Sequence, residues 1–251
     1  MRVTVLEKVY GPIQPEALQP YFAGICSGLE VKVMVVGVNP RGWIQLEVDG
    51  EDEEVAVRLL EREVGLAPIT LQQAWTHPTL KGKVSSVERG GLLVDVGIIH
   101  PTPTDAYIPL QRLRAQVADG APTPIHEIVD TYCLHANVPV EVRLIERRGE
   151  DGRIEAELSD AQIGIFHDWA ASHLDRLVIL GATHHSIKRA LKASKHWRDV
   201  IRVERLGLLE HAVLCKLGTD AEGLIPELGP HLPHATLLPF KPDKAYKLLG
   251  A

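Results

Sequence analysis

The stretch that most limits the fold spans residues 81–162, where short segments alternate between apolar and polar residues. Such alternation is clearest over residues 91–98, 138–145 and 154–158, and it is typical of strands with one buried face. A Gly90-Gly91 turn separates the first of these from a preceding strand, and residues 106–110 predict a fifth. Because closure removes unpaired edges, five short strands in this length predict a small β-barrel.

The order of these segments resembles the S1-type RNA-binding domain, which has an OB fold. The matching pieces are Gly82-Lys83-Val84 and residues 91–97, 106–113, 140–145 and 152–159. The resemblance covers about a third of the chain. It implies an oligonucleotide-binding barrel of the kind that holds single-stranded RNA.

Residues 1–78 predict a separate α+β domain. Apolar positions alternate around residues 3–5, 31–35, 44–48 and 69–71, and they recur at helical spacing over residues 18–29 and 55–64. The resulting order, βαββαβ, is that of a ferredoxin-like fold. The acidic run at residues 51–54 could bind a metal ion, but carboxylates at the start of a helix favour its dipole, which is the interpretation we prefer.

Residues 163–251 predict two helices followed by a partial β repeat. Ser159 and Gln162 form a capping box for the first helix, whose apolar positions continue through Leu177 to a stop at Gly181. Thr183 then caps the second helix. Residues 203–209 repeat the pattern of residues 87–93, and residues 219–226 repeat that of residues 104–109. The expected domains are therefore 1–78, 79–162 and 163–251, which together make an α+β multidomain protein.

The whole chain resembles an uncharacterised archaeal protein family with a ferredoxin-like N-terminal domain and an S1-type middle domain. Within the C-terminal third, the resemblance lies in residues 198–201, 210–213 and 216–221. It implies a domain order and a cytoplasmic protein. No run of eighteen apolar residues predicts a membrane span, and the first residues read as a strand rather than a signal peptide.

The net charge of −6 by itself disfavours a general nucleic-acid binder, but the charge is unevenly placed. Residues 1–80 carry −5, residues 81–162 carry −4 and residues 163–251 carry +3. Between Lys188 and Arg205, seven basic residues stand against two acidic ones. Lys188, Lys192 and Lys195 share one helix face, and such a stripe neutralises phosphates without reading sequence.

Two hypotheses follow. The first is a non-enzymatic RNA-binding factor associated with a ribonucleoprotein, such as the ribosome, or with the translation machinery. Trp197 and Tyr107 would stack on bases in this hypothesis, although Trp197 could instead lie in the core. The residues expected to contact RNA are Lys81, Lys83, Tyr107, Arg147, Arg148, Lys188, Lys192, Lys195, Trp197 and Arg198.

The second hypothesis is a protein-interaction adaptor in a transcription or translation assembly. Its basis is that S1-type domains usually carry aromatic residues on the second and third strands. Here the second strand has Leu92 and Leu93, and the third has only Tyr107. Exposed leucines on the barrel would then anchor a protein partner.

Enzymatic chemistry has no supporting pattern, so we expect no catalytic residue and no cofactor. Gly90-Gly91 lacks the lysine and the helix of a phosphate-binding loop. His126, Cys133 and His135 fall short of a metal site, and the adjacent His184 and His185 diverge on a helix. Three widely spaced cysteines indicate buried thiols rather than disulfides.

Overall fold

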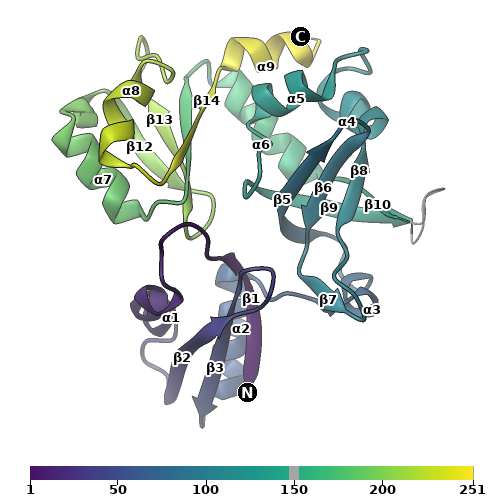
Figure 1. The fold of residues 1–251 in the computed structure, drawn as a ribbon, viewed down its shortest axis with the longest axis vertical. Coiled ribbons are helices and arrows are strands. Elements are labelled where there is room, and N and C mark those ends of the chain that lie inside the picture. Colours follow the sequence, from purple (N-terminus) through teal and green to yellow (C-terminus); the bar gives the residue numbers. More distant parts are fainter. Residues whose placement is uncertain (147–152, 251) are drawn as a thin grey trace. The chain divides into compact units, whose positions relative to one another are not determined.

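The computed structural model describes residues 1–146 and 153–250, and it combines helices and strands in two compact units (Figure 1). The first unit contains Met1–Ala74 together with Gly97–Pro103. The second contains Trp75–Val96 and the chain from Thr104 onward. Among the described residues, no helix is both long and apolar enough to cross a membrane.

The first unit is built on an antiparallel three-stranded sheet in the order β1-β3-β2. Ile44, Leu46 and Val48 of β3 are buried at alternate positions, and α2 buries Leu60 and Val64 from one of its faces. Its elements are β1 (Arg2–Lys8), η1 (Pro15–Leu18), α1 (Gln19–Ile25), β2 (Val31–Val38), β3 (Trp43–Gly50) and α2 (Glu53–Val64).

The chain leaves this sheet soon after α2. Leu66 makes an isolated antiparallel bridge with Val5 of β1. The segment expected as a fourth strand, β4 (Ile69–Thr70), pairs instead in parallel with β7 (Ile98–His100), before α3 (Leu71–Ala74). Residues 97–103, which lie between two barrel strands in sequence, therefore belong to the first unit.

The second unit begins with a closed five-stranded barrel, which confirms the barrel that the alternating segments predicted. The strand order is β10-β8-β6-β5-β9, and β9 pairs with β10 to close the ring. The β8–β10 pair is parallel, and the other pairs are antiparallel. The strands are β5 (Leu80–Glu88), β6 (Gly91–Asp95), β8 (Ala106–Pro109), β9 (Pro139–Glu146) and β10 (Ile154–Leu158).

Two helices, α4 (Leu110–Val117) and α5 (Ile125–Tyr132), lie between β8 and β9 in sequence. The hydroxyl of Tyr132 donates a hydrogen bond of 2.7 Å to the carbonyl of Val117 and so ties the two helices together. Among the described residues, no group of three or more histidine, cysteine, aspartate or glutamate side chains could hold a metal ion.

The C-terminal part of the second unit is an antiparallel four-stranded sheet in the order β12-β13-β11-β14. Ile187 and Leu191 of α7 pack with Leu224 and Leu228 of α8 onto one face of this sheet. The elements that form this part are α6 (Asp160–Ala171), β11 (Arg176–Leu180), α7 (His184–Ala193), η2 (His196–Arg198), β12 (Val200–Arg205), β13 (Glu210–Cys215), α8 (Leu224–Leu228), η3 (Gly229–His231), β14 (Thr236–Phe240) and α9 (Pro242–Leu248).

This part differs from the two helices and partial barrel repeat that we expected. The first helix ends at Ala171, and Leu177 lies in β11, a central strand of the sheet, because its continuous apolar run is buried on both faces. Residues 203–209 do form a hairpin turn region, like residues 87–93. Residues 219–226, however, lead into α8 rather than a strand. The element order from β11 to β14 is βαββαβ.

Both predicted helix caps are present. The hydroxyl oxygen of Ser159 accepts a hydrogen bond of 3.1 Å from the backbone N–H of Gln162, and that of Thr183 accepts one of 3.2 Å from Ser186. The Gln162 amide oxygen does not complete a capping box in its usual form, since it accepts from the backbone N–H of Glu141 on β9. This contact fastens the start of α6 to the barrel.

The barrel and the C-terminal sheet are joined through α6. The Trp169 ring lies 5.1 Å from the ring of Phe240 on β14, and the guanidinium of Arg176 lies 5.0 Å from the Trp169 ring centroid. The helix α9 also contacts α5 and α6 (Figure 1). Every residue of β13 is buried, so both faces of the C-terminal sheet are covered there.

Candidate nucleic-acid interface

The helix α7 and the turn that follows it expose three lysines to solvent. Ile187, Ala190 and Leu191 are buried against the sheet, as the amphipathic spacing of the helix requires. This packing leaves the opposite side of α7 in solvent, where Lys188 and Lys192 are exposed. Lys195, just beyond the helix, is exposed as well.

A left-handed turn after α7 exposes the tryptophan. Lys195 has a φ of +66°, and this reversal begins the short helix η2. Trp197 is 55% exposed, so the alternative that it lies in the core is wrong. The guanidinium of Arg198 lies 5.3 Å from the Trp197 ring centroid, at cation–π distance. We call Lys188, Lys192, Lys195, Trp197 and Arg198 the α7 basic face.

The nearby acidic groups have other partners. Asp199 binds the Nδ1 atom of His196 at 2.8 Å, and Glu204 forms an ion pair of 2.6 Å with Arg202. None of the four cations of the α7 basic face forms an ion pair within the described residues. Their charge is therefore available to a polyanion, and such contacts would weaken with salt.

Lys83, in contrast, does not lie on the surface. Only 2% of its side chain is exposed, and its ammonium group lies 2.7 Å from the carboxylate of Glu210, which is fully buried. Because β5 is covered at this point by the C-terminal sheet, the residue joins two parts of the second unit. The expectation that Lys83 contacts RNA phosphate is not compatible with this position.

The other barrel residues are spread out. Lys81 is exposed on β5, while Tyr107 is half-buried with the guanidinium of Arg153 lying 4.8 Å from its ring centroid. Arg153 also pairs with Glu88 at 2.7 Å. The Tyr107 ring is thus half-buried and also contacted by Arg153, so it leaves less free surface for base stacking than the exposed Trp197 ring does. The predicted contacts Arg147 and Arg148 lie outside the described residues.

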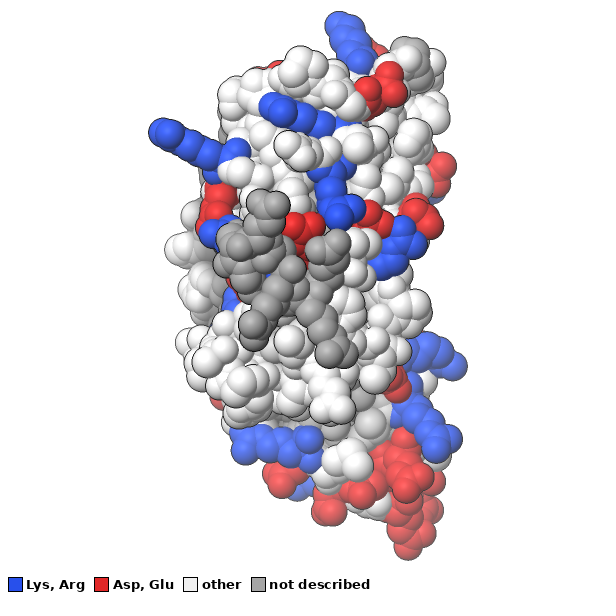
Figure 2. All heavy atoms as spheres, turned by 90° about the vertical axis from the view of Figure 1, so that its right-hand side faces the viewer, with Lys and Arg blue, Asp and Glu red and all other residues white. Residues whose placement is uncertain are grey.

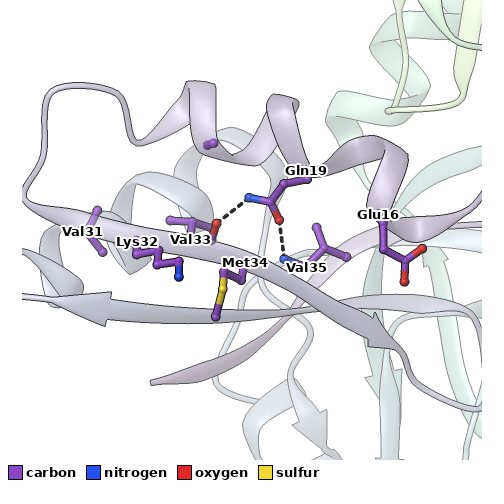
Figure 3. A pocket seen from close by; sticks show the side chains of 8 residues that line it. Glu16, Gln19, Val31, Lys32, Val33, Met34 and Val35 are labelled. Atoms are coloured by element: carbon purple, nitrogen blue, oxygen red, sulfur yellow. Dashed lines mark hydrogen bonds between the residues drawn. The ribbon is translucent and has the colours of Figure 1, made fainter.

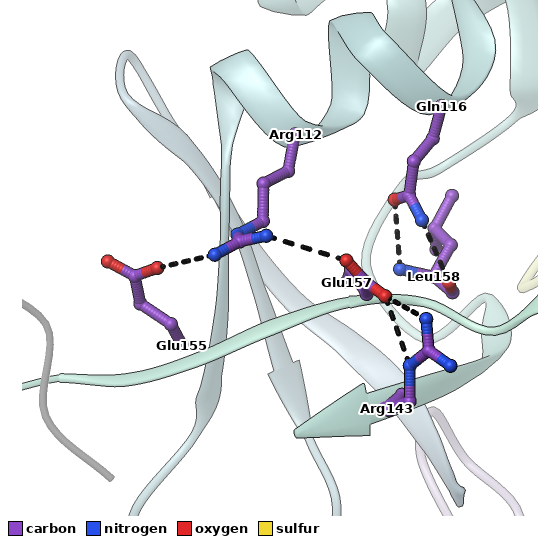
Figure 4. A network of polar contacts seen from close by, with 6 residues as sticks. All are labelled: Arg112, Gln116, Arg143, Glu155, Glu157 and Leu158. Atoms are coloured by element: carbon purple, nitrogen blue, oxygen red, sulfur yellow. Dashed lines mark hydrogen bonds and ion pairs between the residues drawn. The ribbon is translucent and has the colours of Figure 1, made fainter. Parts of the chain in front are cut away.

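Ion pairs cover the outer side of β10. Arg112 of α4 reaches Glu155 at 3.4 Å and Glu157 at 3.5 Å, and Arg143 of β9 also binds Glu157 (Figure 4). On the face shown in Figure 2, basic and acidic side chains are intermingled around the barrel. Leu92, one of the leucines expected on the surface, is buried in the core. This side of the barrel offers phosphates few unopposed charges.

A groove of about 600 Å³ lies in the first unit, between α1 and the edge strand β2 (Figure 3). Its lining is mainly apolar, with Val33, Val35 and Met34 from β2. The Gln19 amide donates to the carbonyl of Val33 at 2.6 Å and accepts from the N–H of Val35 at 2.7 Å. The amide of Gln19 is thus directed at the β2 backbone rather than into the groove.

Family models match three consecutive segments of the chain. They are described as the DUF2110 N-terminal domain (residues 2–68), central domain (residues 76–170) and C-terminal domain (residues 174–238). The chain belongs to the DUF2110 family. These descriptions state no activity. No curated protein matches this DUF2110 chain.

Among solved structures, a protein from Thermus thermophilus resembles the DUF2110 chain at 14% sequence identity and a TM-score of 0.16. The match covers 98% of this chain and 42% of that protein. The DUF2110 chain therefore spans less than half the length of that protein. At this TM-score, the resemblance supports no conclusion about fold or function.

Sequence reasoning missed the polar residues of β13 in the DUF2110 protein. Glu210 and His211 are both fully buried, and His211 stacks on His184 at the start of α7. The signal was a Glu-His pair inside the apolar run from Leu208 to Cys215, because buried polar side chains need a partner. Which partners they meet depends on residues far away in sequence.

Proposed function

We propose that this DUF2110 protein is a non-enzymatic RNA-binding factor that acts in the cytoplasm with a ribonucleoprotein or the translation machinery. The α7 basic face carries the proposal, because it combines unopposed cations with the exposed ring of Trp197. Phosphates would meet the cations, and an unstacked base would lie on the tryptophan. This division of labour suits structured RNA that has single-stranded segments.

The barrel supports the proposal through its topology. In chain order its strands are β5, β6, β8, β9 and β10, and the parallel β8–β10 pair with helices before β9 is the arrangement expected of an OB fold of the S1 type. The bridge between Leu66 and Val5 likewise supports a ferredoxin-like first unit whose fourth strand is reduced to one residue.

The test replaces two lysines of the α7 basic face. Lys188→Gln with Lys192→Gln should weaken binding to a hairpin RNA with a single-stranded loop by about tenfold at low salt. The slope of log K against log salt should fall by about 1.4, since two contacts to single-stranded phosphates are lost. Binding can be followed by tryptophan fluorescence, because the exposed Trp197 should be quenched.

The matched control is Lys244→Gln with Lys247→Gln, which removes the same charge from the exposed surface of α9. This variant should bind RNA as the wild type does. Equal losses in both variants would show only a general charge effect. If the wild type binds no RNA at low salt, the proposed function is wrong.

A protein-interaction adaptor is the second candidate, and the ion pairs on the barrel favour it. Since Arg112 and Arg143 are engaged by Glu155 and Glu157, this side of the barrel is better suited to a protein than to RNA. Partners that co-purify with the protein and persist after nuclease treatment would support the adaptor. Partners that disappear would support RNA binding.

A further inference from the structure

Two histidines stack at the start of α7, next to the α7 basic face. The ring centroids of His184 and His211 lie 5.6 Å apart, and their planes are inclined by 5°. His184 is the first residue of α7 and is half-buried, whereas His211 lies on β13 and is fully buried. Lys188 lies one helical turn after His184 and therefore on the same side of α7.

The burial of His211 has no evident structural reason. Neither ring nitrogen makes a hydrogen bond of regular geometry within the described residues, although the backbone of Ala182 is near enough to favour the protonated ring. Leaving a buried polar group without a regular hydrogen bond is energetically costly. Since His211 faces the first turn of α7, that cost is incurred beside the helix N-terminus.

The charges that act on this pair are positive. Burial lowers the pKa of His211 to about 4, with the nearby His184 and Arg205 acting in the same direction. The pKa of His184 is lowered by burial, then by Lys188 and Arg205. Glu210 precedes His211 and points to the opposite face of the sheet, where it meets Lys83. The N-terminus of α7 adds a further partial positive charge.

An anion suits this arrangement better than a metal ion. A metal bound by both imidazoles would have to lie in the plane of each ring, and two parallel, stacked rings share no such point. A phosphate, by contrast, is bound by helix N-termini and cationic side chains. In α7, the cap Thr183 already engages the N–H of Ser186, so the N–H of His184 at the start of the helix has no intrahelical partner.

We propose that the first turn of α7 is a phosphate-binding subsite formed by His184 and Lys188, with the buried His211 stacked against His184. The inference rests on the proposed function in one respect, which is that the phosphate is taken to be a terminal phosphate of the bound RNA. The bound phosphate would place a negative charge near Lys188 and Arg205, the two positive charges that act on His184. It would therefore favour protonation of His184.

The first experiment uses inorganic phosphate and the whole protein. Histidine ring signals in NMR spectra at neutral pH should shift saturably for His184 and His211 as phosphate is added, and not with sodium chloride at equal ionic strength. His184→Gln should weaken phosphate binding by about tenfold, the loss of one charge-assisted contact. Lys188→Gln, an exposed substitution, should weaken it similarly. His185→Gln, exposed on the same turn, is the matched control and should not.

The second experiment compares RNA with a 5′-phosphate and the same RNA with a 5′-hydroxyl. The wild type should prefer the phosphorylated RNA by about tenfold, and His184→Gln should lose that preference. If RNA binds but phosphate causes no saturable shift, or if His185→Gln acts like His184→Gln, the subsite is wrong and the proposed function stands. If phosphate binds saturably but no RNA does, the subsite stands for free phosphate and the proposed function is wrong.

Discussion

Burying Lys83 costs the protein the hydration of an ammonium group, and the carboxylate of Glu210 offsets that cost at 2.7 Å. Neither side chain has appreciable contact with water. Removing one partner therefore breaks an ion pair that is shielded from water and leaves the charge of the other buried. Removing both leaves an apolar contact, which such sites tolerate far better.

We predict that Lys83→Met lowers the free energy of unfolding by about 3–5 kcal/mol. The double variant Lys83→Met with Glu210→Met should recover part of that loss, since both charges of this ion pair are then removed. Urea unfolding followed by circular dichroism measures both. Lys81→Met, two residues earlier and exposed, is the control and should change stability by less than about 0.5 kcal/mol.

Lys83 also shows where sequence reasoning about single residues stops. Its neighbour Lys81 is exposed as expected, and the pattern of β5 does not distinguish the two lysines. The difference is made by Glu210, which lies 127 residues away. For Trp197 the limit is local instead. Its exposure follows from the left-handed turn at Lys195, and the sequence has no glycine at that position to indicate such a turn.

Among the elements, β2 shows how an exposed sheet edge is protected. The Gln19 side chain bonds to the carbonyl of Val33 and the N–H of Val35, as a neighbouring strand would (Figure 3). Val36 and Val38 are about 40% exposed further along the same strand. Such an apolar edge is prone to pair with another chain unless it is blocked.

Replacing Gln19 with alanine should have two effects. The loss of two hydrogen bonds should destabilise the first unit by about 2 kcal/mol, and the open β2 edge should promote self-association. Thermal unfolding and sedimentation velocity measure these effects. Gln14→Ala removes the same side chain from an exposed position nearby and should cause neither. Unchanged stability and a monomeric Gln19→Ala would contradict this role.

The elements that the sequence predicted well are those whose pattern is local. Alternating apolar residues predicted the barrel strands, and Ser159 and Thr183 predicted the starts of α6 and α7. The strand β11 was missed, because its apolar run continues the helical spacing of α6 without a glycine or proline between them. Its position at the centre of a sheet depends on β13 and β14, which follow much later in sequence.

At the scale of the whole molecule, the two compact units are not two consecutive stretches of the sequence. Residues 97–103 belong to the first unit although both flanking segments belong to the second. A glycine is required at the start of this excursion, since Gly97 has a φ of +87° and a Cβ there would lie 2.7 Å from the Cβ of Ala67. Residues of the same compact unit, rather than residues that are adjacent in sequence, should therefore unfold together in opening events.

Native-state hydrogen exchange tests this division. Gln19→Ala should accelerate exchange in β1, β3 and also in β7, but not in the barrel strands β6 and β8 on either side of β7 in sequence. Lys83→Met should accelerate exchange in the barrel and in β11 and β13 together, because they share the second unit. Exchange of β7 in step with β6 and β8 would contradict the division.

The buried contact between Lys83 and Glu210 also has a consequence for biosynthesis. A ribosome that adds about 5–20 residues per second completes Glu210 roughly 6–25 s after Lys83, since 127 residues separate them. The barrel sequence is complete only once Leu158 of β10 has been added, and Glu210 follows 52 residues later (210 − 158), so for that time the barrel is made but the carboxylate of Glu210 is not. The Lys83 ammonium gains this partner only when β13 has been made, so the second unit should reach its final packing only after the C-terminal sheet has been synthesised.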